Sequence, residues 1–140
     1  MEKTLDSSFF RMVNDGLTEE DIRMMSPLVW AYVGDGVYEL LVRTYVVKRG
    51  LSTQKLHRLS SGKVSAKGQL KFYESIKSHL DEEEESIFRR GRNAHSYTMA
   101  KNMTVGEYRA ATGLEALFGY LYLMKREERI LKLFQLGMEG

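Results

Sequence analysis

Two carboxylates stand where the surrounding pattern predicts buried apolar side chains. Asp35 lies between glycines in WAYVGDGVYEL, residues 30–40, and Glu115 lies in ATGLEALFGYLYL, residues 111–123. A buried carboxylate without a partner is costly, so an arginine, a proton or a divalent cation must remove that cost. Hard cations such as Mg²⁺ take one or two carboxylates, waters and substrate phosphates as ligands. If two helices bring these acids together, the pair would support metal-assisted phosphodiester hydrolysis.

The residues next to Asp35 bear on this hypothesis. Glu39 follows one helical turn later on the same side and is a further candidate ligand. Gly34 and Gly36 would allow close helix approach, or room for a metal-bound water and a substrate. The sequence leaves open a simpler interpretation, in which the acids are partly exposed or paired with Arg43 or Arg109.

Two polar segments carry the side chains that usually donate to phosphate oxygens. Residues 60–69, SSGKVSAKGQ, contribute Ser61, Lys63, Ser65, Lys67 and Gln69, and residues 89–102, RRGRNAHSYTMAKN, contribute Arg89, Arg90, Arg92, Asn93, His95, Ser96, Thr98, Lys101 and Asn102. No aromatic repeat of the kind that stacks single-stranded bases accompanies them, so a duplex fits better than a single strand. Ordinary surface polarity and a helix end are the alternative.

The elements that must position these residues are predicted to be helices. Apolar residues recur mostly at helical spacing, and the chain has one proline, which predicts an all-α domain. Ser26 and Pro27 start, and Gly50 ends, a central apolar helix of about 20 residues. Further helices are predicted after Thr18, from Ser52 through Ser60, over about 63–79, after Asp81, from the Thr104–Glu107 capping box to about Met124, and over about 127–136. The acidic run 81–85 suits a helix start and is assigned no chemistry. Residues 95–103 are predicted to form a loop.

Composition sets broad limits. The 140 residues suit one domain, and the absence of cysteine excludes disulfides and cysteine-bound zinc. No apolar run approaches the ~18 residues of a membrane span, and the start does not resemble a secretory signal, so the cytoplasm is expected. Net charge is +2, but residues 43–77 carry nine bases and one acid. That imbalance suits a polyanion partner or a solvated face, and charge alone does not decide between them.

At these motifs the chain resembles the ribonuclease III family. YVGDGVYEL resembles its signature, and ATGLEALFGYLYL resembles its second acidic motif. The segments KVSAK, RRGRNA, KN and YRAATGLEALFGYLYL point to the compact Mini-ribonuclease III branch. The resemblance runs over about residues 26–136 of a single domain, 1–140.

The resemblance implies an all-α helical bundle that acts as a homodimer on double-stranded RNA without a separate RNA-binding domain. It implies Mg²⁺ as the metal, with Mn²⁺ able to substitute, and maturation of the ends of 23S ribosomal RNA precursors. Asp35 and Glu115 would be the metal-binding catalytic residues. Lys63, Lys67, Arg89, Arg92, Asn93 and Lys101 would grip phosphates. Assistance from a ribosomal protein is left open.

This chain departs from the family pattern at several positions. The longer enzymes carry glutamates where Leu28 and Ala31 stand, and an aspartate where Thr112 stands, so fewer direct metal ligands are expected here. His95 and Ala100 replace a lysine and a proline of the compact branch.

The sequence leaves two other classes of protein as alternatives. A non-catalytic helical RNA- or ribosome-binding protein would explain the basic segments but not the two acids. An all-α metal-dependent nucleotide hydrolase would need a denser acid cluster than the chain offers outside residues 81–85. The dimer is also a physical expectation, because a long helix that is apolar on more than one face needs a partner to cover it.

Overall fold

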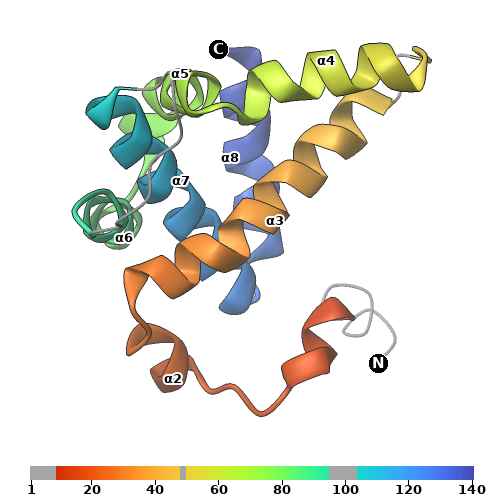
Figure 1. Ribbon diagram of the computed structural model, residues 1–140. Coiled ribbons are helices and arrows are strands. Elements are labelled where there is room, and N and C mark those ends of the chain that lie inside the picture. The colour runs from red at the N-terminus through yellow and green to blue at the C-terminus, as the bar shows by residue number, and fades with distance from the viewer. Residues whose placement is uncertain (1–8, 48–49, 95–103) are drawn as a thin grey trace.

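The computed structural model describes residues 9–47, 50–94 and 104–140 (Figure 1). Within those ranges the chain is helical and has no strand, which confirms the all-α prediction. The elements in chain order are η1 (Phe10–Asn14), α2 (Glu19–Arg23), α3 (Pro27–Val47), α4 (Thr53–Val64), α5 (Ala66–Ile76), η2 (Lys77–His79), α6 (Glu82–Arg92), α7 (Val105–Leu123) and α8 (Glu127–Glu139). Among these helices, none combines the length and the apolarity that a bilayer crossing requires.

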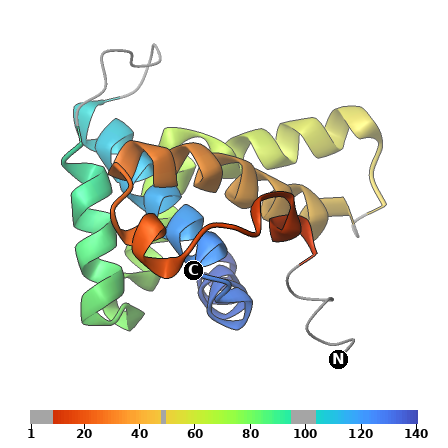
Figure 2. The ribbon, with the colours of Figure 1, turned by 90° about the horizontal axis from the view of Figure 1, so that it is seen from below.

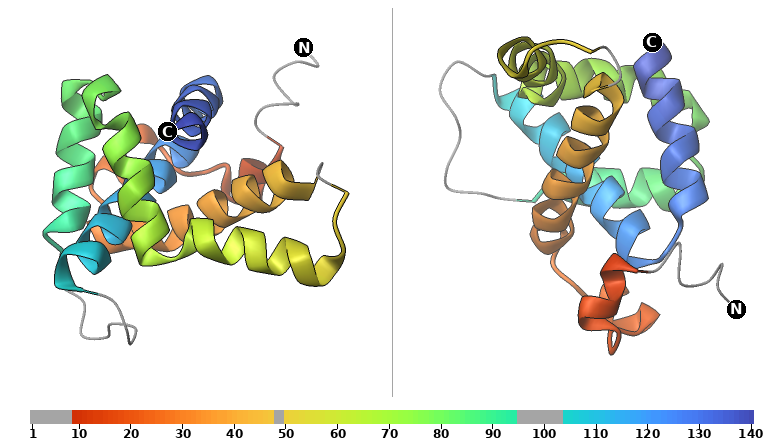
Figure 3. Two further views of the ribbon diagram at one scale, coloured as in Figure 1. Left: turned by 90° about the horizontal axis from the view of Figure 1, so that it is seen from above. Right: turned by 90° about the vertical axis from the view of Figure 1, so that its right-hand side faces the viewer.

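Helix α7 is the centre of the bundle. It contacts α3, α5, α6 and α8, and every residue from Ala110 to Leu121 except Glu115 is buried. Figure 1 shows α3 crossing α7, with α6 on the opposite side of α7 from α8. Figure 2 shows η1 and α2 running across one side of the bundle, and Figure 3 shows α3 and α4 extending from it together. The fold therefore surrounds one acid-bearing helix with the others.

Helices α3 and α7 meet backbone to backbone. A Cβ atom on Gly34 would lie 1.6 Å from the carbonyl oxygen of Glu115, and one on Gly119 would lie 1.8 Å from that of Trp30. Only glycine fits at these two positions, because any side chain would overlap the facing backbone. The crossing places Gly34, the residue before Asp35, against the backbone of Glu115.

Capping residues define the helix starts that the sequence predicted. Thr18, Asp81 and Thr104 each form a capping box, and Ser52 accepts from the amide of Lys55. The Ser26 hydroxyl accepts from the Leu28 amide at the start of α3. These interactions are local, which explains why the sequence located them correctly.

Three helix boundaries differ from the prediction. Helix α4 runs on to Val64 rather than ending at Ser60, and α5 begins at Ala66 rather than near Lys63. Ser65 causes this division, because its amide closes the end of α4 on Ser61 while its hydroxyl accepts from the Gly68 amide and starts α5. Helix α8 also extends past Leu136 to Glu139.

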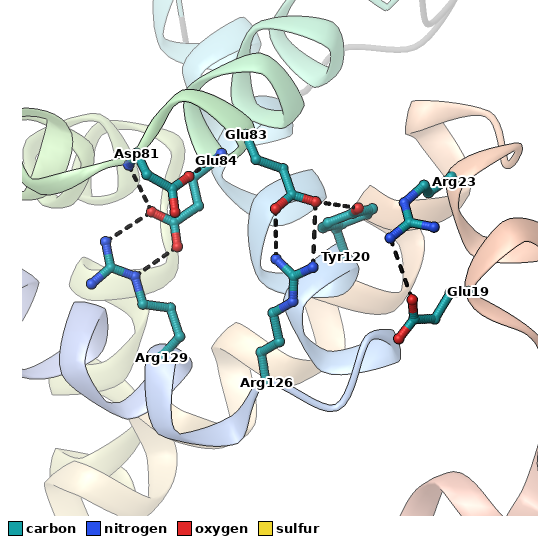
Figure 4. Close-up of polar contacts among 8 residues, drawn as sticks. All are labelled: Glu19, Arg23, Asp81, Glu83, Glu84, Tyr120, Arg126 and Arg129. Atoms are coloured by element: carbon teal, nitrogen blue, oxygen red, sulfur yellow. Dashed lines mark hydrogen bonds and ion pairs between the residues drawn. The ribbon is translucent and has the colours of Figure 1, made fainter.

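The acidic run at the start of α6 binds α6 to α8 (Figure 4). Glu84 is 2% exposed, and its two carboxylate oxygens accept from Nε and NH2 of Arg129 at 2.6 and 2.8 Å. Glu83 accepts from Arg126 at 2.8 Å and from the Tyr120 hydroxyl at 2.7 Å. The run therefore has a structural role.

Candidate active site

Asp35 lies on α3 beside the crossing with α7, with its side chain exposed. In the described part of the chain it has no hydrogen bond or ion pair, so the predicted alternative of an arginine partner does not hold for it. Partial desolvation raises the pKa of its carboxyl, and the charge of Glu39 raises it further. The group is therefore positioned as an available ligand rather than as part of a structural ion pair.

Glu115 lies on α7 at the same crossing of α3 and α7. Burial raises the pKa of its carboxyl to about 7, the hydrogen bond from Gln69 opposes that rise, and the charge of Asp35 adds to it. Neither Arg43 nor Arg109 pairs with it in the ranges that the structure describes. The charge of Asp35 thus acts on Glu115 across the crossing, where Gly34 packs on the Glu115 backbone. That the two acids converge on one ion stays a prediction.

This pair has the chemistry of a small oxygen-ligand site for a divalent cation. Its two carboxylates repel each other, and a cation between them would favour the charged form of both. No group of three His, Cys, Asp or Glu residues suited to a metal occurs among the described residues. Two carboxylates are nevertheless a donor set that fits Mg²⁺, because this ion commonly keeps several waters and is also bound by substrate phosphates.

Glu39 shares the Asp35 face of α3 but is already engaged. Its carboxylate pairs with Arg43 one turn later at 2.5 Å. Because that carboxylate has a cationic partner, Glu39 is less available to a metal than Asp35.

The two glycines beside Asp35 have different surroundings. Gly34 permits the close approach of α3 and α7, which is one of the two roles that the sequence predicted for these glycines. Gly36 lines an apolar hollow with Val33 and Leu40, and a Cβ atom there would meet no atom within 4 Å. The idea that Gly36 leaves room for a metal-bound water stays a prediction.

The positions where longer relatives of the family carry extra acids surround the pair. Leu28 and Ala31 lie on the Asp35 face of α3, about two turns and one turn earlier, at half-buried and buried positions. Thr112 is buried, and its hydroxyl donates to the Tyr108 carbonyl at 3.0 Å within its own helix. These three side chains supply no carboxylate, so they add no acidic ligand to the candidate pair.

A basic elbow, defined here as residues 63–67 between α4 and α5, borders the acids. Lys67 is exposed, and Lys63 is half-buried, with its carbonyl accepting from the Tyr38 hydroxyl at 3.1 Å. Ser65 is exposed and donates to the Gly62 carbonyl at 3.0 Å. The elbow therefore carries two ammonium groups and a hydroxyl on one short segment of the surface.

The last turn of α6 carries the second predicted phosphate-binding group. Arg89, Arg90 and Arg92 are exposed there. The guanidinium of Arg90 lies 4.7 Å from the centre of the buried Trp30 ring, and the Asn93 side chain accepts from Arg92 at 3.3 Å. Arg90 thus also covers the core, while Arg89 and Arg92 remain open to solvent. Five predicted donors lie outside the described residues, as does the predicted loop 95–103: His95, Ser96, Thr98, Lys101 and Asn102.

Gln69 has a different role from the one that the sequence indicated. It was grouped with the phosphate donors, but it is 3% exposed and its amide nitrogen donates to Glu115 Oε2 at 3.1 Å. A signal for this was present, because Gln69 occupies a core position of α5 in register with Ala66, Phe72 and Ile76. A polar residue at a core position is the same anomaly that singled out Asp35.

Comparison with known proteins assigns the class. A family model described as the ribonuclease III domain matches residues 28–126, which include both acids. Mini-ribonuclease 3 from Clostridium tetani is 42% identical over 126 residues, covering 89% of this chain and 83% of that protein. Mini-ribonuclease 3 from Staphylococcus aureus is 44% identical over 119 residues, covering 83% of this chain and 89% of that protein.

A solved structure supports the same assignment. The crystal structure of a protein from Fusobacterium nucleatum superposes with a TM-score of 0.78 at 39% identity, covering 86% of this chain and 98% of that one. The chain therefore belongs to the ribonuclease III family, a class of endoribonucleases. Within that class it falls in the Mini-ribonuclease III group, as the sequence motifs indicated.

Proposed function

We propose that this endoribonuclease cleaves double-stranded RNA by Mg²⁺-dependent phosphodiester hydrolysis at Asp35 and Glu115. One observation carries the proposal: Gly34, the residue before Asp35, packs directly on the backbone of Glu115, and neither carboxylate has a cationic partner in the described ranges. Membership of the ribonuclease III family supports the choice of double-stranded RNA as substrate.

Each acid has a defined task in this proposal. Asp35 is exposed and would bind the metal from the side that faces the substrate. Glu115 is half-buried and would bind the metal from the side that faces the core. When bound between them, Mg²⁺ would make a water more acidic and neutralise charge on the scissile phosphate. Mn²⁺ has similar ligand preferences and would substitute for it.

The basic groups around the acids would hold the RNA backbone. Lys63, Ser65 and Lys67 on the elbow, and Arg89 and Arg92 on α6, offer donors to phosphate oxygens. Lys101 and Asn102 would add to them. Contacts of this kind follow the shape and backbone of a duplex rather than its sequence, and they weaken as salt concentration rises.

We also propose that the active enzyme is a homodimer formed along α3. One stripe of that helix consists of Val29, Val33, Gly36, Leu40 and Val47. Within it, Leu40 is 58% exposed and Val47 is 57% exposed. The stripe borders an apolar hollow of about 530 Å³ that Ile130 and Leu131 also line. An apolar surface of this kind is costly in water, and a second copy related by a two-fold axis would cover it. Sedimentation that shows only monomers at micromolar concentration would contradict this.

The proposed substrate in the cell is the precursor stem of 23S ribosomal RNA, and the proposed place is the cytoplasm. A dimer would present one site to each strand of such a stem and leave staggered ends. The resemblance to Mini-ribonucleases 3 supports this choice. Cleavage of a synthetic precursor stem at one defined position per strand is the expected result.

A direct test uses three labelled nucleic acids. Long duplex RNA, single-stranded RNA and duplex DNA are each incubated with the protein in Mg²⁺ or in EDTA. We expect cleavage of the RNA duplex alone, and only with Mg²⁺. Binding of duplex RNA without cleavage under any divalent metal would instead indicate a non-catalytic RNA-binding protein.

A further inference from the structure

The side chain of Gln69 joins the catalytic pair to the basic elbow. Its amide nitrogen donates to Glu115 Oε2 on α7 at 3.1 Å and to the carbonyl oxygen of Val64 at 2.9 Å. Val64 is the last residue of α4, where carbonyl groups lack partners within the helix. One side-chain amide therefore connects an active-site acid to the segment that carries Lys63, Ser65 and Lys67.

The direction of this amide follows from its neighbours. The Val64 carbonyl can only accept a hydrogen bond, so the NH₂ group of Gln69 must face it, and its second proton is directed to Glu115. In this orientation Gln69 Oε1 is buried and has no partner within the described ranges. A buried, unpaired acceptor is energetically unfavourable. A leucine or methionine would fill the same space without that cost, so the amide is not explained by packing.

A second donor to the same elbow offers a comparison. The Tyr38 hydroxyl, from α3, donates to the carbonyl of Lys63, one residue before Val64. Tyr38 and Gln69 thus both hold the end of α4. Only Gln69 also donates to an acid of the catalytic pair.

We propose that Gln69 is a positioning residue for Glu115. Its amide would hold Oε2 of Glu115 and leave Oε1 directed to the cation, while tying that carboxylate to the elbow that grips phosphate. Hydrogen bonds behind a metal ligand fix its rotamer, and losing them commonly costs about 10- to 100-fold in metal affinity or activity. This inference rests on the proposed function, because it assumes that Glu115 is a metal ligand.

The test replaces Gln69 and uses Tyr38 as the matched control. Gln69→Met keeps most of the volume but removes both hydrogen bonds, whereas Tyr38→Phe removes only the bond to the elbow. Mn²⁺ binding to each RNA-free protein is measured by the loss of the free-ion paramagnetic resonance signal. We expect Gln69→Met to bind Mn²⁺ about 10- to 100-fold more weakly than wild type, and Tyr38→Phe to stay within about threefold of it.

Cleavage kinetics on duplex RNA give the second measurement. Gln69→Met should lower kcat by about 10- to 100-fold, and its KM should stay within about threefold, because the phosphate-binding side chains remain. Gln69→Asn, which is too short to reach both partners, should show a smaller loss of both kcat and Mn²⁺ affinity. It replaces Gln69→Met if that variant does not fold, as judged by circular dichroism.

Two results would overturn the inference. One is a folded Gln69 variant with wild-type kcat and Mn²⁺ affinity. The other is an equal loss of kcat and Mn²⁺ affinity in Tyr38→Phe. That result would show that any bond holding the elbow has this effect, and that the bond from Gln69 to Glu115 has no separate role. Wild-type protein that cleaves no duplex RNA and binds no Mn²⁺ would instead defeat the proposed function itself.

Discussion

The molecule contains two sets of carboxylates with opposite surroundings. Glu83 and Glu84, at the start of α6, each bind an arginine of the α8 region, and these contacts hold the pKa of Glu83 below its ordinary value. Asp35 and Glu115 have no cationic partner in the described ranges, and their pKa values are raised. The dense acidic cluster is therefore structural, and the two isolated acids are the candidate site. An acid without a cationic partner is a better guide to chemistry than local acid density.

The largest expected effect comes from neutralising either isolated acid. Asp35→Asn or Glu115→Gln should lower duplex RNA cleavage by about 10³-fold or more, because several kcal/mol of metal-based stabilisation is lost. Gel-based cleavage assays measure this, with circular dichroism and RNA binding in EDTA as controls that should not change. Substantial cleavage by either variant would mean that the replaced acid is not catalytic.

Breaking the structural set should instead lower stability. Arg129→Met leaves Glu84 buried without its cation and should reduce the free energy of unfolding by about 3 kcal/mol. Urea denaturation measures this loss. The cleavage rate of the folded variant at low temperature should match wild type. A selective fall in kcat without loss of stability would give the acidic run a catalytic role.

The two sets should also respond to pH in opposite directions. Glu115 is an acid with a raised pKa, so the metal-free fold binds its proton more tightly than the unfolded chain does, and stability falls as pH rises from about 4.5 to 7. The loss should be at most about 3 kcal/mol, and Glu115→Gln should remove it. Glu83 has a lowered pKa, so its contribution is present above about 4.5 and is lost as pH falls below that value.

Urea denaturation at pH 5 and pH 7.5 in EDTA tests this contrast. Added Mg²⁺ should recover stability at the higher pH in wild type, because it favours the charged acids. If the free energy of unfolding changed with pH in wild type just as it does in Glu115→Gln, burial would not disfavour the charged form of Glu115.

The smallest effect is expected at Glu39, which combines features of both sets. It lies on the Asp35 face but pairs with Arg43, and both side chains of that pair are more than a third exposed. Glu39→Gln should change the free energy of unfolding by about 0.3–0.5 kcal/mol, and cleavage should stay within about threefold. Cleavage assays that show a loss as large as in Asp35→Asn would make Glu39 a third metal ligand.

Much of the fold was predictable because its signals are local. Thr18, Asp81 and Thr104 start their helices through side chains that reach only three residues along the chain. The α4–α5 boundary was predicted less well, because Ser65 ends one helix and starts the next within a single polar segment. For the candidate site, the sequence singled out Asp35 and Glu115. It grouped Gln69 with exposed phosphate donors, although the core spacing of Gln69 on α5 was a signal of its burial.

The sequence alone determined the helices, their caps and the two acids that break the apolar pattern, since periodicity and capping depend on neighbours along the chain. Only the tertiary structure decided what those side chains meet. Gln69 reaches Glu115 across 46 residues and Arg129 reaches Glu84 across 45. Contacts at such separations depend on the angle and register at which helices cross, and here close contact at Gly34 and Gly119 sets that approach.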